Sequence, residues 1–346
     1  NHHRQQFSIP ILGLTGTNGK TTTKELINTV LSQKWNVLAT KGNLNNHIGV
    51  PLTLLSLTKE HQIGLIEMGA NKPGDIKELC EIADPDFGLI TNIGKAHLEG
   101  FGNVETVLKT KTELYHHIRN KKGKIFLPTE NSLLKEKAEG IAFNSYGFHS
   151  GNVIGENVKV NPFLSLDINT NEGKFEVKTH LVGSYNAENI LAAVCIGNHF
   201  GLTNSQIKKG LEDYIPSNNR SQIIQKVNGL VLMDAYNANP SSMKAALENF
   251  TAIDHPNKFF VLGDMFELGD SSEIEHRAII DLATEKKLKG ILAGKQFFAL
   301  KNDSNSFVIS TEEAKIQLQK LHLKNYLLLI KGSRGMKMEG LLEVLV

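Results

Sequence analysis

A glycine-rich segment near the start of the chain has the composition of a phosphate-binding loop. It follows an apolar run, and its residues are Gly16, Thr17, Asn18, Gly19, Lys20, Thr21 and Thr22. Glycines let backbone N–H groups close around phosphate oxygens, and a following helix adds the positive end of its dipole. We expect Lys20 to reach the β- and γ-phosphates and the Thr21 hydroxyl to help hold Mg²⁺. Leu14 stands where the longer nucleotide loop has a glycine, so the match is to the shorter Gly-x-x-Gly-Lys-Thr form.

Three other residues could take part in metal chemistry. Glu67 ends an apolar run, and a carboxylate at the C-terminal edge of a parallel sheet, near a phosphate loop, is a typical Mg²⁺ ligand. His97 follows another such run, although a lone histidine is more often structural. Lys111 has the spacing of an ordinary lysine on a helix surface. From the residues alone, both interpretations of His97 and Lys111 stay open.

The elements that must position these residues alternate between short apolar runs and amphipathic stretches. We expect buried strands at 9–14, 64–68, 87–93 and 124–127. We expect helices at 21–31, 74–82 and 104–118. Strands that alternate with helices indicate βαβ units and a mostly parallel sheet. The first part of the chain is therefore predicted to be an α/β domain built around the phosphate loop.

The alternation changes at about residues 152–182. Alternating residues around an Asn- and Gly-rich turn at 169–173 predict a small antiparallel sheet, as an insertion or an edge of the first domain. Helices are expected near 186–199 and 203–214, followed by a linker at 215–219 that contains proline and small polar residues. After it, strands are expected at 231–234, 259–263, 290–293 and 326–330, with helices near 241–250, 272–287 and 311–321.

The predicted fold is therefore α/β with two domains. We expect residues 1–216 to form a phosphate-loop domain and residues 217–346 to form a smaller, Rossmann-like α/β domain. A length of 346 residues agrees with this division, because a typical domain has about 150 residues.

Composition excludes several classes of protein. Lys and Arg total 38 against 36 Asp and Glu, and this near balance argues against a surface built to hold nucleic acid. Cys80 and Cys195 are too few for a disulfide framework or a zinc site, and we expect both to be buried free thiols. No run has the ~18–20 apolar residues of a membrane span, and the start lacks the apolar core of a signal peptide. A cytoplasmic location is the default expectation.

Several segments together resemble the Mur ligase family, the amide-forming ligases of peptidoglycan precursors, which also includes folylpolyglutamate synthases. The segments are TGTNGKTT at 15–22, KGNLNNHIGVP at 41–51, EMGAN at 67–71, YNANPSSM at 236–243, GDMFELG at 263–269 and KGSRGMKME at 331–339. They keep the family's order and extend over nearly the whole chain. Their combination is specific, whereas any one of them alone is not.

The resemblance implies roles for the metal and nucleotide residues. Thr21, Glu67 and His97 would be Mg²⁺ ligands, and Lys111 would be carbamylated to become an anionic ligand of a second Mg²⁺; Lys109 is the competing register. The loop residues 16–22 would bind ATP, and Asn186 and Asn189 would contact the adenine. Tyr185 stands where the family commonly has histidine.

The resemblance also implies roles in the second domain. Arg220 would reach back to the γ-phosphate, and Asp234 would meet the ribose; Asn219 stands before Arg220 where glycine is usual. Lys331, Ser333 and Arg334 would face either the nucleotide or the incoming substrate. The remaining candidate substrate contacts are Asn45, Asn46, Tyr236, Asn237 and Asn239.

The implied activity is ATP-dependent ligation of D-alanyl-D-alanine to UDP-N-acetylmuramoyl-tripeptide through an acyl phosphate, with Lys20, His97, Lys111 and Arg220 in catalytic roles. Three alternatives remain at this point: a family member that adds a single amino acid, a folylpolyglutamate synthase, and a nucleotide-binding module without turnover.

The resemblance further implies a monomer and an N-terminal, UDP-binding domain ahead of the phosphate loop. The loop begins about fifteen residues from the start of this sequence. We therefore expect the sequence to lack that domain, to bind ATP, and to turn over the UDP-linked substrate poorly.

Overall fold

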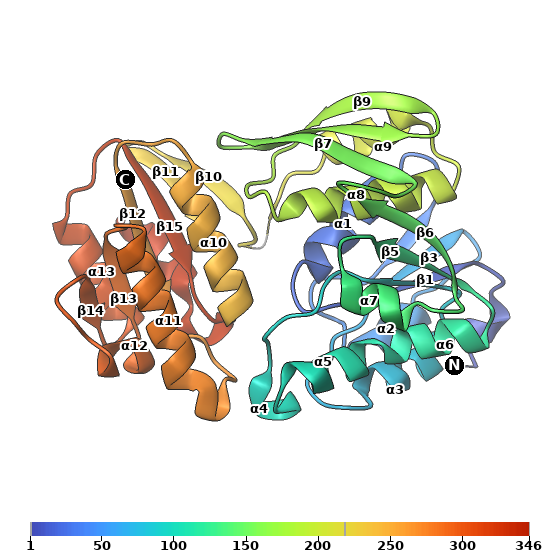
Figure 1. Cartoon of the computed structure of the whole chain (residues 1–346), viewed down its shortest axis with the longest axis horizontal. Helices are drawn as coiled ribbons and strands as arrows, with labels where there is room; N and C mark the ends of the chain where they lie inside the picture. The colour runs from blue at the N-terminus through green and yellow to red at the C-terminus, as the bar shows by residue number, and fades with distance from the viewer. Residues whose placement is uncertain (1, 218, 346) are drawn as a thin grey trace.

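The computed structural model describes residues 2–217 and 219–345, which form two lobes side by side (Figure 1). Each lobe has one sheet with helices on both faces, so the predicted α/β fold class is confirmed. The predicted domain boundary falls between α9 and β10, and Asn218 of the predicted linker lies outside the described residues. None of the described helices is long and apolar enough to cross a membrane.

Within the described residues, the first lobe contains a nine-stranded sheet in the order β2-β3-β1-β4-β5-β6-β7-β8-β9. Its strands are β1 (Ile11–Thr15), β2 (Val37–Ala39), β3 (Ile63–Glu67), β4 (Phe87–Ile90), β5 (Lys124–Pro128), β6 (Ala142–Gly147), β7 (Val153–Val160), β8 (Leu164–Thr170) and β9 (Gly173–Lys178). Strands β1 to β7 pair in parallel, while β7-β8 and β8-β9 pair antiparallel. The predicted antiparallel strands therefore extend the same sheet at one edge.

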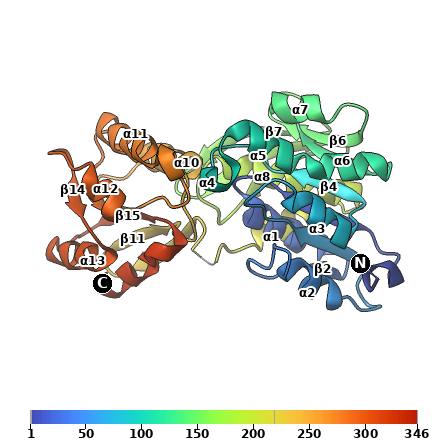
Figure 2. The same ribbon diagram turned by 90° about the horizontal axis from the view of Figure 1, so that it is seen from below.

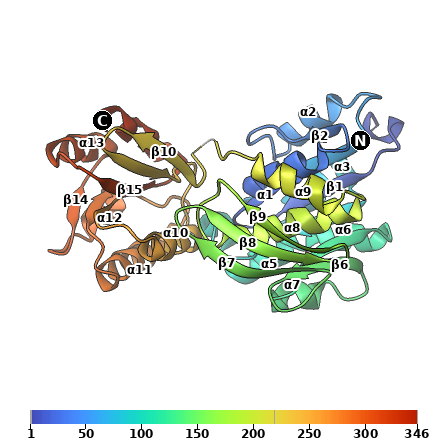
Figure 3. The same ribbon diagram turned by 90° about the horizontal axis from the view of Figure 1, so that it is seen from above.

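Two apolar cores fill the faces of this sheet. The helices are η1 (Arg4–Gln6), α1 (Lys20–Leu31), α2 (Gly49–Leu55), α3 (Asp75–Ala83), α4 (Leu98–Phe101), α5 (Val104–Lys111), α6 (Glu113–Asn120), α7 (Ser132–Lys137), α8 (Asn186–His199) and α9 (Asn204–Glu212). Helices α1, α8 and α9 lie together over one face (Figure 3). Helices α2, α3 and α6 supply apolar residues to the core on the opposite face.

In the described part of the second lobe, six strands form the order β10-β11-β15-β12-β13-β14. They are β10 (Gln222–Lys226), β11 (Gly229–Met233), β12 (Lys258–Gly263), β13 (Gly290–Ala293), β14 (Ser306–Val308) and β15 (Tyr326–Lys331). All pairs are parallel except β10-β11. The helices are α10 (Pro240–Ala252), η2 (Gly269–Ser271), α11 (Ser272–Glu285), α12 (Lys295–Ala299), α13 (Thr311–Lys320), η3 (Arg334–Met336) and η4 (Met338–Val344).

One of the predicted helices differs in the structure. The expected single helix at 104–118 is two helices, α5 and α6, which meet at Thr112. The Thr112 hydroxyl donates to the carbonyls of Leu108 and Lys109, a back-bond that bends helices.

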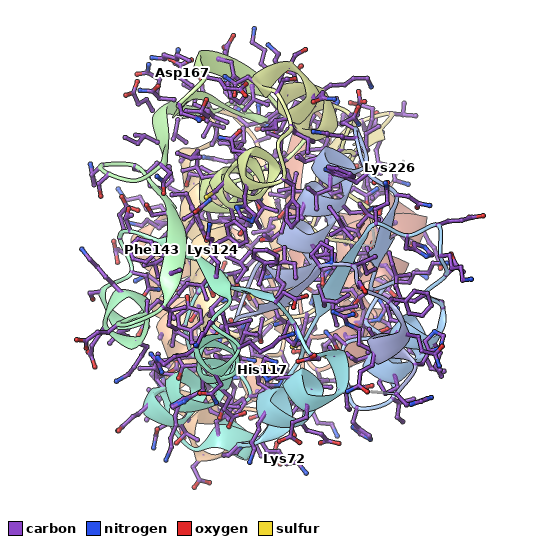
Figure 4. The ribbon with its side chains drawn as sticks, turned by 90° about the vertical axis from the view of Figure 1, so that its right-hand side faces the viewer. Lys72, His117, Lys124, Phe143, Asp167 and Lys226 are labelled. Carbon is purple, nitrogen blue, oxygen red and sulfur yellow. The ribbon has the colours of Figure 1, made fainter. Side chains whose placement is uncertain are left out.

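Both cysteines are buried free thiols, as predicted. Each lies in a helix that packs on the first sheet, and burial raises the pKa of Cys195 to about 12. At the end of the first lobe that faces away from the second, Asp167 of β8 and Lys72, just before α3, lie at opposite extremes (Figure 4). Lys72 is also one of the residues that line the cavity between the lobes.

Candidate functional site

The candidate site lies where the C-terminal ends of parallel strands from both sheets meet. In the first lobe, β3, β1 and β4 are neighbours, so the phosphate loop, Glu67 and the segment after β4 leave the same sheet edge. In the second lobe, β11, β15 and β12 are neighbours, and Asp234 and Lys331 stand at their ends. Ligands of open α/β sheets bind at this edge.

A cavity of about 1040 Å³ lies between these two edges. The predicted site residues that line it are Thr17, Asn18, Gly19, Lys20, Thr21, Thr22, Asn45, Asn46, Glu67, His97, Asn186 and Asn189 from the first lobe, and Arg220, Asp234, Tyr236, Asn237, Asn239 and Lys331 from the second. The volume is that of a site for a large ligand. Most predicted residues are therefore brought together in one place.

The phosphate loop needs glycine at two positions. Gly16 has φ of 145°, and a Cβ there would lie 2.0 Å from the Thr91 hydroxyl. Gly19 caps α1 with φ of 78°, and its Cβ would lie 2.8 Å from the Asn189 side-chain oxygen. Larger residues would displace the loop from the sheet edge. The positions of the backbone N–H groups in this turn therefore depend on both glycines.

Lys20 is turned toward its own loop. Its Nζ donates to the carbonyl of Gly16 at 2.8 Å and to that of Thr17 at 3.1 Å. Burial lowers the pKa of Lys20; the nearby Arg220 lowers it further, whereas the Glu67 carboxylate opposes both. An anion that enters the cavity would therefore meet two positively charged side chains, Lys20 and Arg220, whose charges the protein does not fully neutralise.

Glu67 is held by short contacts on one side only. Its Oε1 accepts from Asn45 Nδ2 at 2.8 Å and from the Thr21 hydroxyl at 3.2 Å. Its backbone N–H donates to the Thr40 hydroxyl at 3.0 Å. Its Oε2 is buried and has no hydrogen-bond partner among the described residues. A buried carboxylate oxygen without a donor fits a site for a cation.

His97 lies in the left-handed conformation, with φ of 51°, at the start of α4. Its Nδ1 lies against the carboxylate of Glu267, which belongs to the second lobe. Burial lowers the pKa of His97, while Glu267 opposes this change. His97 lines the cavity, and a histidine ring can bind a metal ion through either of its nitrogens.

Lys111 is buried, whereas Lys109, the competing register, is exposed. Its Nζ lies 5.9 Å from the centroid of the Phe101 ring, and it forms no ion pair within the described residues. Burial lowers the pKa of Lys111 well below its ordinary value, and the charge of Lys20 adds to this effect. A buried lysine amine that favours its neutral form is suited to react with CO₂.

Asn186 and Asn189 connect α8 to the phosphate loop. Asn189 Nδ2 donates to Asn186 Oδ1 at 2.9 Å, and Asn186 Nδ2 donates to the carbonyl of Val182 at 2.7 Å. The Thr23 hydroxyl of α1 donates to Asn189 Oδ1 at 3.0 Å. The pair is buried, so it fixes the wall of the cavity beside the loop.

Arg220 is stacked on an aromatic ring in the second lobe. Its Cζ lies 3.6 Å from the centroid of the Tyr236 ring, and its Nε is buried without a partner among the described residues. Nearby, Lys331 Nζ lies 2.7 Å from Asp234 Oδ2 and also donates to the carbonyl of Asn237. Asp234 Oδ1 accepts the N–H of Ser221 at 3.1 Å, so Asp234 is held on both oxygens.

Four predicted residues do not line the cavity: Gly16, Lys111, Ser333 and Arg334. Ser333 is buried, and its hydroxyl accepts the N–H of Phe266. Arg334 is largely exposed and pairs with Glu339 at 2.9 Å. These two contacts organise the end of β15 rather than the cavity wall.

Some cavity residues were not predicted from the sequence. Asn92 accepts the N–H of Asn18 at 2.9 Å, and the Tyr185 hydroxyl lies 2.9 Å from that of Ser221 across the two lobes. Tyr185 was noted only as a departure from the family pattern. Asn92 follows β4, at the edge where Glu67 also lies, and that position was the available signal.

Three predicted substrate contacts make hydrogen bonds within the protein: Asn45, Asn46 and Asn239. Asn46 Oδ1 accepts the N–H of Gly49 at the start of α2. Asn239 caps α10 and its Nδ2 donates to Asn18 Oδ1 at 2.8 Å, which links the second lobe directly to the phosphate loop.

Comparison with known proteins gives matches over both lobes. The model of the Mur ligase middle domain matches residues 14–197, and that of the Mur ligase glutamate ligase domain matches residues 219–334. The UDP-N-acetylmuramoyl-tripeptide–D-alanyl-D-alanine ligase of Bacillus subtilis (strain 168) is 32% identical over 355 residues, which cover 99% of this chain and 77% of that protein.

Two solved structures are also similar. A crystal structure of MurF from Acinetobacter baumannii has a TM-score of 0.91 and 35% identity, and the match covers 99% of this chain and 78% of that one. MurF ligase from Thermotoga maritima in complex with ADP has a TM-score of 0.90 and 27% identity, over 99% and 81% of the two chains. The chain therefore belongs to the Mur ligase family of ATP-dependent, amide-bond-forming ligases and acts in peptidoglycan synthesis.

Proposed function

We propose that this protein joins D-alanyl-D-alanine to UDP-N-acetylmuramoyl-tripeptide and converts ATP to ADP and phosphate. The observation that carries the proposal is the cavity lined by both lobes, with a phosphate loop on one side and Arg220 on the other. The relatives named for this reaction support the choice of substrates, because they match nearly the whole chain.

The phosphate loop would bind the nucleotide through its backbone N–H groups. Lys20 would leave the carbonyls of Gly16 and Thr17 and turn to the β- and γ-phosphates, because a phosphate oxygen is the stronger acceptor. Asn186 and Asn189 would border the adenine, and Asp234 the ribose. The Thermotoga maritima relative was solved in complex with ADP, which supports nucleotide binding by this chain.

Thr21 and Glu67 would hold a first Mg²⁺, and His97 with Lys111 would hold a second. The unpartnered Glu67 Oε2 fits this use, because it is an anionic oxygen that the protein leaves free. Within the described residues no three His, Cys, Asp or Glu side chains form a metal cluster, so a carbamate on Lys111 would supply the missing anion. Bound Mg²⁺ would neutralise charge that develops on the transferring phosphoryl group.

The chain's cations would act on the phosphoryl-transfer step. The terminal carboxylate of the tripeptide attacks the γ-phosphorus, the bond to ADP breaks, and an acyl phosphate forms. Lys20 and Arg220 would stabilise the negative charge of this transition state from opposite lobes. The dipeptide amine then attacks the acyl carbon and expels phosphate, with loss of one proton from the amine.

Phosphate release by the purified protein tests this proposal. We expect release with ATP that depends on both UDP-N-acetylmuramoyl-tripeptide and D-alanyl-D-alanine. Replacement of the dipeptide by single amino acids, or of the tripeptide by shorter precursors or a folate, should abolish it. Turnover with one of these replacements instead would contradict the proposal and identify another member of the family; ATP binding without turnover on any precursor would indicate a binding module.

A further inference from the structure

The segment 94–101, which follows β4 and contains His97, is held by both lobes; we call it the His97 segment. Its helical part, α4, lies at the boundary of the two lobes in both views (Figures 1 and 2). We propose that Glu275 is a positioning residue, which holds the His97 segment on the second lobe through Lys95. The inference rests on the proposed function, in which His97 helps to hold a Mg²⁺ ion and Arg220 acts from the second lobe.

One contact between the His97 segment and the second lobe is an ion pair. Lys95 Nζ lies 2.6 Å from Glu275 Oε1 of α11. The Lys95 side chain is 52% exposed, whereas that of Glu275 is only 11% exposed. Glu275 therefore gives up most of its hydration, and an acid in that position needs the ammonium of Lys95 as its partner.

Two backbone hydrogen bonds fix the register of the segment on the second lobe. The N–H of Lys95 donates to the Ser241 hydroxyl at 3.1 Å, at the start of α10. The N–H of Glu99 donates to the carbonyl of Glu267 at 3.2 Å. Since the Glu267 side chain lies against His97 Nδ1, the same residue holds the backbone and the ring. A carboxylate on the second nitrogen of a ligand histidine fixes the orientation of the ring.

An apolar contact completes the interface. Leu98 is 9% exposed and belongs to the apolar core of the second lobe, together with Met265 and Leu268. A first-lobe leucine thus completes the core of the second lobe. Opening of the lobes would expose this side chain to water.

The other end of the His97 segment touches the phosphate loop. The N–H of Gly94 donates to the Thr17 hydroxyl at 3.0 Å. The segment is therefore a direct connection between the nucleotide loop and the second lobe, so closure would set the position of His97 relative to the phosphates.

Charge-reversal variants test the proposal, and the measured quantity is the distance between the two lobes. Glu139→Cys and Lys320→Cys place fluorophores on exposed positions of different lobes, while Cys80 and Cys195 are buried and unreactive. In the presence of ATP, we expect Glu275→Lys and Lys95→Glu each to shift the population toward longer distances. The combined Lys95→Glu/Glu275→Lys exchange should restore the wild-type distance.

Glu273→Lys is the matched control, because Glu273 is an exposed acid on the same helix that pairs only with Arg277 in the described structure. It should leave the distance unchanged. In the ligase assay, the single reversals should lower kcat about 10-fold or more, while the dissociation constant of ATP changes less than threefold, and the exchange should recover most of kcat.

Wild-type distances in both single reversals would overturn the proposal, as would an exchange variant that folds but stays open. The distance measurement requires no turnover. Absence of ligase activity in the wild type would therefore contradict the proposed function and leave the distance result to decide this inference.

Discussion

At the residue scale, the site depends on polar groups that the folded chain leaves incompletely paired. Glu67 Oε2 and Arg220 Nε are buried without partners among the described residues, and Lys111 is buried without an ion pair there. Such groups cost stability unless a ligand completes them. Glu67 and Arg220 both line the cavity, and their charged groups are the physical reason to place ligand chemistry there.

Lys111 gives the first prediction. If its carbamate supplies an anion to the site, Lys111→Ala should lower kcat about 100-fold or more, and acetate or formate should restore part of the activity. Lys109→Ala is the matched control and should retain activity, because Lys109 is exposed two positions away. Full activity of Lys111→Ala, with folding verified by circular dichroism, would rule out this role.

Glu188 of α8 gives a prediction on stability. Burial, and then the negative charge of Glu130, raise its pKa from the ordinary 4.5 to about 7. The folded protein therefore retains this proton up to about pH 7, whereas the unfolded chain releases it near 4.5. The stabilisation is complete below that lower pKa and is lost as pH rises to about 7.

Glu188→Gln should therefore raise the free energy of unfolding at pH 8 by about 1–3 kcal/mol relative to wild type, and the difference should shrink toward pH 4. Urea unfolding across this range measures it. Glu136→Gln is the control, because Glu136 is exposed and should show no such trend. A difference for Glu188→Gln that is the same at every pH would contradict the assignment.

At the element scale, hydrophobic periodicity predicted the long buried strands and most helices, because the spacing of their apolar residues follows the period of the strand or helix. The short strands β2 and β14 were not predicted. Each has only three residues, which are too few to show an alternation of apolar and polar side chains. β6 was missed because its exposed residues include Ala142 and Phe143, which hides the alternation. The break at Thr112 depends on a side-chain bond to its own helix, which spacing does not reveal.

The phosphate loop could be predicted as an element because glycine, lysine and threonine positions carry its mechanism. The residues that surround the loop could not be predicted. Asn92 follows β4 and Asn239 caps α10, and only the fold brings these two side chains to the loop. For the same reason, Ser333 and Arg334 were predicted as ligand contacts from their positions after a strand. The structure gives Ser333 a hydrogen bond with Phe266 and Arg334 an ion pair with Glu339, and Arg334 Cζ lies 6.0 Å from the centroid of the Tyr236 ring. Their roles as ligand contacts stay predictions.

A pair of glycines tests the loop geometry. Gly16 and Gly173 both have positive φ, but a Cβ would meet Thr91 at Gly16 and no atom within 4 Å at Gly173. Gly173→Ala should cost only the backbone strain, about 1–3 kcal/mol. Gly16→Ala should cost about 1–3 kcal/mol more, because the added methyl group overlaps its neighbour. Urea unfolding gives both values, and equal losses would show that the loop can relax around a side chain.

At the scale of the whole molecule, the site exists only where two sheets present their C-terminal edges to each other. The first lobe carries the phosphate loop and Glu67, while the second carries Arg220, Asp234 and Lys331. A reaction that must activate a carboxylate and then admit an amine benefits from this division, because closure can exclude water from the acyl phosphate. The proposed order is phosphorylation of the carboxylate first and attack of the amine second.

Transfer of oxygen-18 from the substrate carboxylate to phosphate tests this order. The terminal carboxylate of UDP-N-acetylmuramoyl-tripeptide is labelled on both oxygens, and the phosphate released with ATP and D-alanyl-D-alanine is analysed by mass spectrometry. An acyl phosphate requires one labelled oxygen in each phosphate and one in the new amide carbonyl. Phosphate without label, released at the same rate as the amide forms, would rule out an acyl-phosphate intermediate.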